Sequence, residues 1–365
     1  MTVHERNSFM GFYVSKDNNQ IRLRISYQSH EIISQDIAEF QNMPEKEEIK
    51  MSSFLNKIIN NFCNEAESTV YAKKQKIYDK YLEWLKGLEN AKKTALQLTE
   101  KEIQDRFEKI KEKYSQPPRA KGQNLKLIMT KPTIEMLENS QEKDLYEDKI
   151  SNYLAALIQE YTALSREERE RIFFKDLFKK INLCIKHRHQ TEIEVNSSYL
   201  MKPYKITTNG FLPYYYVVGY ARRKNKLTAP WKPMSFRLQR IRSATEKEDD
   251  EYKFTKEQEA KLKELFKTPA EIAYLSEKKE EVVVRLTKDG YKNYQKILSG
   301  RPVYTDKKKL PDSEKPFVYE LAFNCSNMQA YQYFIRFGME VEVISPEHLR
   351  NGFKNLHENA VKYYK

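Results

Sequence analysis

The sequence lacks the features that would place it in a membrane or in a secreted, disulfide-bonded class. No run of about 18 apolar residues occurs, so no membrane-spanning helix is expected. The first residues contain no apolar signal segment. The three cysteines, Cys63, Cys184 and Cys325, are far apart and odd in number, which fits neither a disulfide framework nor a zinc spacing. We therefore expect a cytoplasmic protein.

Glycine and catalytic motifs are also scarce. The 365 residues include 9 glycines and 13 prolines, too few for a collagen-like or low-complexity chain. No glycine-rich phosphate loop and no Gly-x-Ser-x-Gly motif is present. His187 and His189 lie close together in the sequence, but no acidic residue has a suitable spacing from them. We expect no catalytic residue, no metal and no cofactor.

Positive charge, by contrast, is abundant and concentrated. The chain has 65 Lys and Arg against 52 Asp and Glu, a net charge of +13. Residues 171–245 contain 16 basic and 3 acidic residues, so this segment alone accounts for +13, and it also contains twelve aromatic residues. Basic groups bind phosphates, and aromatic rings stack on unpaired bases. The segment predicts nucleic-acid binding; the alternative is a barrel with an aromatic core and merely solvated lysines.

The first third contains a strand–helix–helix pattern that occurs twice. Residues 21–27 alternate between apolar and polar, as in a half-buried strand, and residues 31–40 and 54–62 have helical spacing. A second strand at 124–129 is followed by helical patterns at 132–137 and from Ser151 onward, and a long helix is expected over 70–114. Six positions match at an offset of 99: Ser52, Phe54, Leu55, Ile58, Ile59 and Phe62 fall on Ser151, Tyr153, Leu154, Leu157, Ile158 and Tyr161. We interpret this as a degenerate repeat; the alternative is two unrelated amphipathic helices.

This pattern resembles the ribbon–helix–helix fold, whose outward strand residues read base edges in the major groove. The possible DNA-reading residues would be Arg22, Arg24 and Ser26. The region is net acidic, however, and arginines also protect exposed strand edges. A dimerising or docking role is therefore the alternative.

The basic segment contains short strand patterns joined by polar turns. It resembles the WYL domain, an Sm-like β-barrel that binds nucleic acid and other ligands. The family's Pro-Tyr pair corresponds to Pro203-Tyr204, its Trp-Tyr-Leu to residues 215–217, and its Phe-Arg-Leu-Asp-Arg-Ile to residues 236–241. Here Tyr215 replaces the Trp, and Gln239 replaces the Asp, which removes a carboxylate beside two arginines.

Residues 281–286 and 335–350 resemble the opening and close of the WYL carboxy-terminal extension, which commonly dimerises. The order of the parts resembles the WYL-domain accessory proteins found beside type VI-D CRISPR–Cas effectors, which target RNA. This resemblance implies a non-catalytic, single-stranded RNA-binding protein that enhances RNA cleavage by the effector. It also implies a homodimer formed through the carboxy-terminal half, with no membrane contact.

Together these observations predict an α+β fold with four parts. They are a ribbon–helix–helix region with a helical insertion (18–170), a WYL domain (171–245), a linker (246–278) and a dimerising extension (279–365).

Because successive strand residues point to opposite faces, Tyr215 is expected to point away from Tyr214 and Tyr216, and one of the two faces is core. The alternative function is a DNA-binding transcriptional regulator with a ligand-sensing WYL domain. The predicted RNA-binding residues are Arg237, Arg240, Tyr204, Lys205, Tyr215, Tyr216, Arg222, Arg223 and Lys224.

Overall fold

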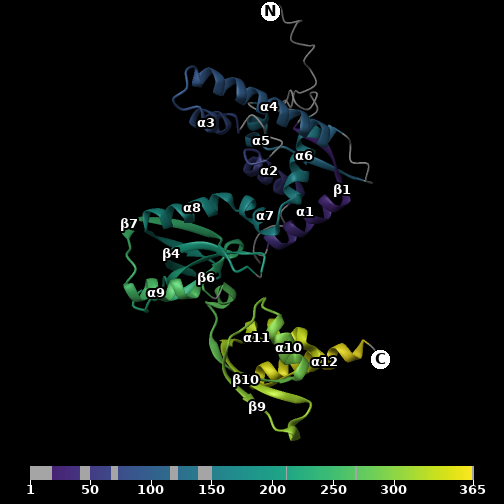
Figure 1. Ribbon diagram of the computed structural model, residues 1–365, viewed down its shortest axis with the longest axis vertical. Helices are drawn as coiled ribbons and strands as arrows, with labels where there is room; N and C mark the ends of the chain where they lie inside the picture. The colour runs from purple at the N-terminus through teal and green to yellow at the C-terminus, as the bar shows by residue number, and fades with distance from the viewer. Residues whose placement is uncertain are drawn as a thin grey trace, which may run out of the picture. The chain divides into compact units, whose positions relative to one another are not determined.

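The computed structural model describes residues 19–41, 50–66, 73–115, 122–138, 150–210, 212–267 and 269–363, so each predicted part includes residues that lie outside the described ranges. The chain divides into two compact units, Met1–Lys175 and Asp176–Lys365, shown in Figure 1. The described residues form twelve α-helices and three sheets, none of which closes into a barrel. The predicted α+β class is confirmed. No helix among these residues has the length and apolar character needed to cross a membrane.

A two-stranded antiparallel ribbon organises the first unit. Its strands are β1 (Gln20–Ser26) and β2 (Gly122–Ile128), which lie about one hundred residues apart in sequence yet pair within this one chain. Leu23 lies opposite Leu125, and both are buried. The strict alternation of the sequence therefore gives the ribbon one apolar face and one exposed face.

Two helices follow each strand, as the repeat predicts. β1 leads to α1 (Tyr27–Phe40) and α2 (Met51–Phe62), and β2 leads to α5 (Lys131–Glu138) and α6 (Ile150–Ala163). The apolar positions of both copies share one core, because neither half has a partner for its own apolar face. The buried residues from α2 and α6 are Phe54, Leu55, Ile58, Ile59, Phe62, Tyr153, Leu154, Leu157, Ile158 and Tyr161.

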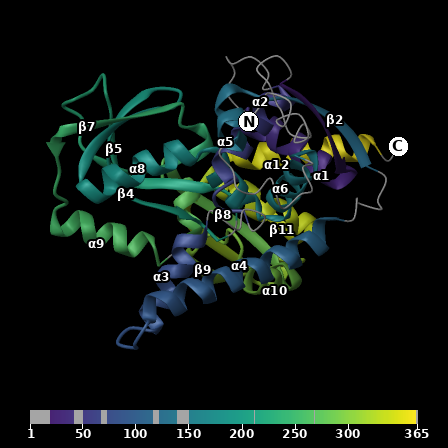
Figure 2. The same ribbon diagram turned by 90° about the horizontal axis from the view of Figure 1, so that it is seen from above.

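The insertion between the copies is two helices rather than one. α3 (Lys74–Trp84) and α4 (Ala91–Ser115) lie side by side in Figures 1 and 2. The chain turns between them, where Gly87 has φ +91° and Asn90 has φ +63°. Glycine and asparagine adopt this left-handed conformation most readily and often end helices there. Ile77 and Ile103 then reach the shared core.

A buried ion pair joins three helices of the first unit. Arg169 of α7 (Arg166–Phe173) donates from Nε and Nη2 to the two carboxylate oxygens of Asp36 on α1, at 2.7 and 3.1 Å. Tyr161 of α6 donates its hydroxyl to Asp36 Oδ2 at 2.9 Å. Asp36 is 2% exposed and Tyr161 is fully buried. Burial, followed by the charge of Asp36, raises the pKa of Tyr161 well above its ordinary value. Every polar group of this cluster thus has a partner inside the protein.

A five-stranded antiparallel sheet opens the second unit. After α8 (Lys175–His187), the strands are β3 (His189–Glu194), β4 (Ser198–Thr208), β5 (Tyr215–Arg223), β6 (Lys232–Arg237) and β7 (Ser243–Glu251). Their order in space is β6-β5-β4-β3-β7. β6 and β7 are the two edges, so among the described residues the sheet does not close into the predicted barrel. Figure 1 shows α8 and the later helix α9 on opposite faces of it.

Residues 246–278, predicted as a linker, are instead packed structure. They include the end of β7, α9 (Lys256–Leu265) and the 3-10 turn Pro269–Tyr274. Leu262 and Ile272 are fully buried against Tyr216, Val218 and Tyr220 of β5. The sequence looked like a linker because it is charged, with few apolar residues. Two of these apolar residues, Leu262 and Ile272, nevertheless cover the sheet.

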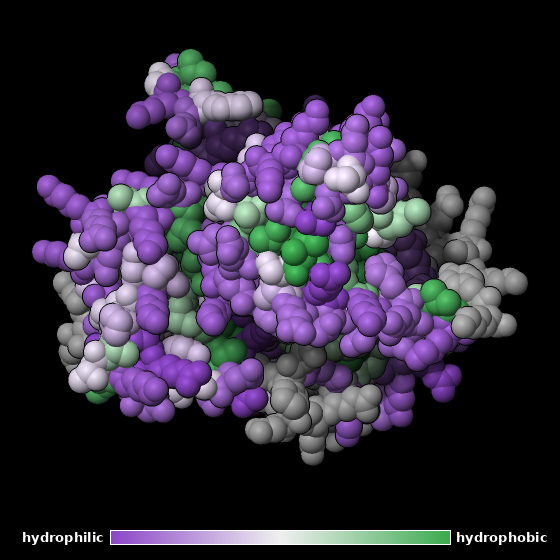
Figure 3. Space-filling view, turned by 90° about the horizontal axis from the view of Figure 1, so that it is seen from below, coloured by the Kyte–Doolittle hydropathy of each residue, from purple (hydrophilic) through white to green (hydrophobic). Residues whose placement is uncertain are grey.

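A second sheet, in the order β11-β8-β10-β9, forms the carboxy-terminal part. Its strands are β8 (Lys279–Thr287), β9 (Tyr304–Lys309), β10 (Phe317–Ser326) and β11 (Val341–Ser345). The helices are α10 (Lys288–Lys296), α11 (Asn327–Phe334) and α12 (Glu347–Lys362). Tyr331, Tyr333, Phe334 and Phe337 are the residues from which we expect apolar surface for a dimer, but the last three are buried in the core of this part and Tyr331 packs against it. The face drawn in Figure 3 is mostly hydrophilic.

Candidate nucleic-acid interface

Three half-buried aromatic residues surround the apolar cluster on one face of the five-stranded sheet. Tyr204 of β4, Tyr214 just before β5 and Trp231 just before β6 pack against the buried residues Tyr216, Val218, Tyr220, Leu262 and Ile272. We call Tyr204, Tyr214 and Trp231 the aromatic rim. Each ring is anchored by the cluster yet keeps part of its surface in solvent, as a base-stacking platform requires.

The closest cation–ring contact of the rim joins the predicted residue Arg237 to Tyr214, which directly precedes the motif at 215–217. The guanidinium carbon of Arg237, at the end of β6, lies 3.5 Å from the centre of the Tyr214 ring. β5 and β6 pair antiparallel with Tyr216 opposite Arg237, so the register brings Arg237 beside the start of β5. An arginine on an aromatic face keeps its N–H groups at the ring edge, where phosphate oxygens accept hydrogen bonds.

Trp231 has a cation on each of two neighbouring strands. Lys202 Nζ of β4 lies 4.7 Å from a ring centre of Trp231, and the guanidinium carbon of Arg222 of β5 lies 4.5 Å from it. Burial, followed by the charge of Arg222, lowers the pKa of Lys202 below its ordinary value. Arg222 Nε is buried and donates to no partner in the described part of the chain. Two cations held together without an anion form a favourable place for a phosphate.

Tyr204 and Lys205 meet at a bulge in β4. The pairing with β5 shifts between Pro203 and Lys205, which leaves Tyr204 as the extra residue. The Tyr204 ring lies 5.7 Å from Phe254 and 5.8 Å from Phe266, and Lys205 Nζ lies 5.2 Å from the Phe266 ring. The predicted pair thus sits at the rim, with the exposed Lys205 at its outer side.

The two other predicted tyrosines are packed in the protein. Tyr216 is 3% exposed and belongs to the apolar cluster, so its ring offers no face to a base. Tyr215 points to the opposite side of the sheet, where its ring lies 5.4 Å from Phe178 of α8. As expected from the alternation of strand residues, Tyr215 and Tyr216 point to opposite faces of the sheet, and Tyr216 points into the apolar cluster.

The remaining predicted residues carry charge at the surface. Arg223, Lys224 and Arg240 are exposed, and Lys224 Nζ lies 2.6 Å from Glu192 Oε1. Arg223 and Arg240 have no ion-pair partner among the residues that the structure describes. By strand alternation Arg223 points to the face of the sheet opposite Arg222, and no contact between Arg240 and Arg237 is found in the described residues.

The predicted DNA-reading strand lies on the exposed face of the ribbon. Arg22 and Arg24 are exposed, and Arg22 lies opposite Lys126 of β2. Ser26 instead caps α1, where its hydroxyl accepts a hydrogen bond from Ser29 N at 3.0 Å. The ribbon therefore presents three cations rather than two arginines and a serine.

Sequence reasoning missed Lys202, Trp231 and Lys126 as members of these surfaces. Lys202 lies beside the Pro203-Tyr204 motif, and Trp231 lies five residues before Phe236, but only strand pairing shows that they meet. The signal for Lys126 was available. It occupies an outward position in the second copy of the repeat, opposite an arginine already singled out.

Comparison with known proteins identifies the fold. No family model matches the chain, and no curated protein matches it. A solved structure described as "Crystal structure of a CRISPR Cas-related protein" is similar with a TM-score of 0.74 and 21% identity, over 97% of this chain and 97% of that chain. A second, "Proteasome accessory factor B/C (PafBC) of Arthrobacter aurescens", has a TM-score of 0.22 and 16% identity over 48% of this chain and 25% of that chain, too low to support an argument. The chain thus shares its fold with a CRISPR Cas-related protein.

Proposed function

We propose that this chain is a non-catalytic, single-stranded RNA-binding accessory protein that enhances RNA cleavage by a type VI-D CRISPR effector. The observation that carries the proposal is the aromatic rim. Tyr214 and Trp231 have Arg237, Lys202 and Arg222 on their rings, and these cations have no carboxylate partner in the described residues. Rings for bases beside cations for phosphates are the recurring components of single-strand binding.

Two further observations support the CRISPR context. The protein of similar fold is described as CRISPR Cas-related, and the likeness extends over nearly the whole of both chains. The order of motifs in the sequence resembles the WYL-domain accessory proteins of type VI-D systems. A ribbon–helix–helix arrangement of the first unit agrees with that order, because β1 and β2 pair antiparallel and two helices follow each.

The proposed mechanism needs binding only. Phosphates of an RNA strand contact Arg222, Lys202 and Arg237, while bases stack on the exposed parts of the rim. Retaining RNA close to the effector raises its effective concentration at the cleavage site. No acid–base step is assigned to this chain.

The experiment is an RNA-cleavage assay with a type VI-D effector, its guide and a collateral reporter RNA, with and without the full-length protein. The test variant is Arg237→Ala with Arg240→Ala. The control is Lys288→Ala with Lys296→Ala, which removes the same charge from exposed positions on α10. We expect wild type and control to increase the cleavage rate equally, and the test variant to lose most of the increase.

Equal stimulation by the test variant and wild type would separate activation from RNA binding and reject the mechanism. Cleavage of RNA by the protein alone, surviving repurification, would place it among the enzymes.

A second candidate function, a DNA-binding regulator, is favoured by the ribbon. Arg22, Arg24 and Lys126 share its exposed face, and a ribbon of this kind fits the major groove. The discriminating measurement compares single-stranded RNA, single-stranded DNA and duplex DNA at matched salt. Tightest binding to duplex DNA, lost in Arg22→Ala with Arg24→Ala, would favour the regulator.

The proposal also includes a homodimer, but its contact surface must differ from the one expected from the sequence. Because Tyr333, Phe334 and Phe337 are core, the contact through 279–365 must use exposed side chains such as Val303 and Met339. Light scattering of the full-length chain tests the dimer. A truncation that removes 279–365 should end at 278 rather than 245, since residues up to Ile272 cover the first sheet.

A further inference from the structure

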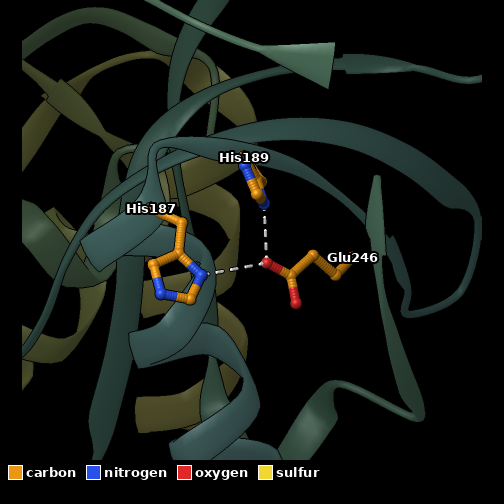
Figure 4. Close-up of side chains that lie close together, drawn as sticks. All are labelled: His187, His189 and Glu246. Carbon is orange, nitrogen blue, oxygen red and sulfur yellow. Dashed lines mark hydrogen bonds and ion pairs between the residues drawn. The ribbon is translucent and has the colours of Figure 1, made fainter. Parts of the chain in front are cut away.

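Two histidines and a glutamate meet in the second unit, away from the aromatic rim. Figure 4 shows His187 and His189 pointing toward the Glu246 carboxylate, from the end of α8, the start of β3 and the middle of β7. Nδ1 of His189 lies 2.8 Å from Glu246 Oε1, and Nδ1 of His187 lies 3.6 Å from the same oxygen. One ligand atom from each residue lies within 4.8 Å of the others. Sequence spacing alone did not indicate that Glu246 lies beside the histidines.

The backbone fixes all three positions. Arg188, between the histidines, has φ +58°, so the chain turns sharply from α8 into β3 and both imidazoles emerge on one side. Its carbonyl accepts a hydrogen bond from Tyr252 N at 2.9 Å, which anchors the turn to the residue after β7. Glu246 lies opposite Thr191 in the β3–β7 pairing. Strand register therefore brings together residues 57 apart in the sequence.

The chemistry of the three groups selects a particular class of ion. Two imidazole nitrogens and one carboxylate oxygen suit zinc and similar divalent transition metals, whereas magnesium and calcium prefer oxygen ligands. Tetrahedral zinc binds such atoms at about 2.0–2.2 Å, which places neighbouring ligand atoms about 3.3 Å apart. The two distances to Glu246 Oε1, 2.8 and 3.6 Å, lie on either side of this spacing. Small rotations of the side chains would therefore bring the ligand atoms to the spacing that zinc requires.

One side of the cluster faces solvent. The side chain of His187 is 46% exposed, while those of His189 and Glu246 are 17% and 19% exposed. Cys184, one turn earlier on α8, is buried and hydrogen-bonded to Thr191. The three ligands thus leave a fourth position for water.

We infer that His187, His189 and Glu246 form a binding site for one zinc-class divalent ion per chain, with its fourth position open to solvent. The bound ion would tie the α8–β3 turn to β7 and stabilise the folded protein, because the unfolded chain does not hold the three groups together.

The test uses the full-length protein without an affinity tag, stripped of metal by a chelator that is then removed. Zn²⁺, Co²⁺ and Mg²⁺ are titrated separately by calorimetry, and the thermal midpoint is measured with and without Zn²⁺. The variants are His187→Ala, His189→Ala and Glu246→Gln. The control is His348→Ala, because His348 Nε2 lies 3.2 Å from Glu280 Oε1, and among the described residues no third His, Cys, Asp or Glu joins this pair.

We expect one Zn²⁺ per chain and a raised thermal midpoint in wild type and control, with no heat from Mg²⁺. Each ligand variant should weaken Zn²⁺ binding by more than about 100-fold, beyond the loss seen when only a residue hydrogen-bonded to a ligand is replaced. His187→Ala is the safest variant for folding, since its side chain is the most exposed of the three. Absence of Zn²⁺ binding in wild type, or equal binding in the ligand variants, would overturn the assignment. A sulfur-to-cobalt charge-transfer band, lost in Cys184→Ser, would overturn the open fourth position.

Discussion

The buried ion pair of the first unit and the aromatic rim of the second unit differ in how their charged side chains are satisfied. In the first unit, Asp36 and Arg169 are buried and bonded to each other, so their charges are satisfied by the fold. In the second unit, Lys202, Arg222 and Arg237 rest on aromatic rings and have no carboxylate partner in the described residues. Charges paired inside a unit hold helices together, whereas charges left without an anion attract a ligand. The predictions below test this difference.

The largest effect is expected from breaking the buried pair. Asp36→Ala leaves the Arg169 guanidinium buried without its carboxylate and the Tyr161 hydroxyl without its acceptor. Removing one partner of such a pair costs about 3–5 kcal/mol of unfolding free energy. Urea denaturation measures this loss, and Glu100→Ala, at an exposed position on α4, should change stability by less than about 0.5 kcal/mol. A loss as small as that of the control would show that the pair does not hold the first unit.

The next effect separates core from rim within the second unit. Tyr216→Ala should lower the unfolding free energy by about 3–5 kcal/mol, as for other large aromatic residues removed from a core. Trp231→Ala should instead lower single-stranded RNA affinity by about 1–3 kcal/mol, the value for one stacked base. Thermal unfolding and RNA titration of both variants measure the two quantities. If Trp231→Ala changes only stability, the rim is core and not a binding surface.

Much of the first unit could be predicted from sequence, because its pattern is local. Residues 21–27 alternate strictly, and the apolar positions of α2 recur in α6, so strand, helices and shared core follow from periodicity. The second unit was harder, since its surfaces depend on pairing between distant strands. Sequence spacing does not predict the contact of Lys202 with Trp231, and it does not predict the contact of Glu246 with His189. The segment around α9 is mostly charged, so its sequence did not predict that Leu262 and Ile272 cover the sheet.

A smaller, pH-dependent effect is expected at Glu65 in the first unit. Burial alone would raise the pKa of this carboxyl, but hydrogen bonds from Arg171 and Lys175 and their charges outweigh it and lower the pKa below 4.5. The lowered pKa contributes stability above pH 4.5, which is lost as the pH falls through the folded-state value. Glu65→Gln should therefore be less stable than wild type at neutral pH, with the difference shrinking in acid. A difference that stays constant with pH in urea denaturation would contradict this.

The smallest effect concerns a carboxylate beside the positive surface, Glu192. Oε1 of Glu192 lies 2.6 Å from Lys224 Nζ, and its Oε2 lies 3.5 Å from Lys247 Nζ. Glu192→Gln frees both lysines and should strengthen RNA binding up to about five-fold at low salt, matching the ~1 kcal/mol limit for an exposed pair. The gain should disappear at high salt. Weaker binding in Glu192→Gln would show that Lys224 does not face the RNA.

The central claim, that the second unit rather than the ribbon binds RNA, is tested most directly by the salt dependence of single-stranded RNA affinity. Two variants each remove two arginines, Arg237→Ala with Arg240→Ala from the second unit and Arg22→Ala with Arg24→Ala from the ribbon. Each lost phosphate contact should reduce the slope of log affinity against log salt by about 0.7. We predict a weaker affinity and a shallower slope for the first variant, with both unchanged for the second. The same losses in the ribbon variant alone would contradict the account.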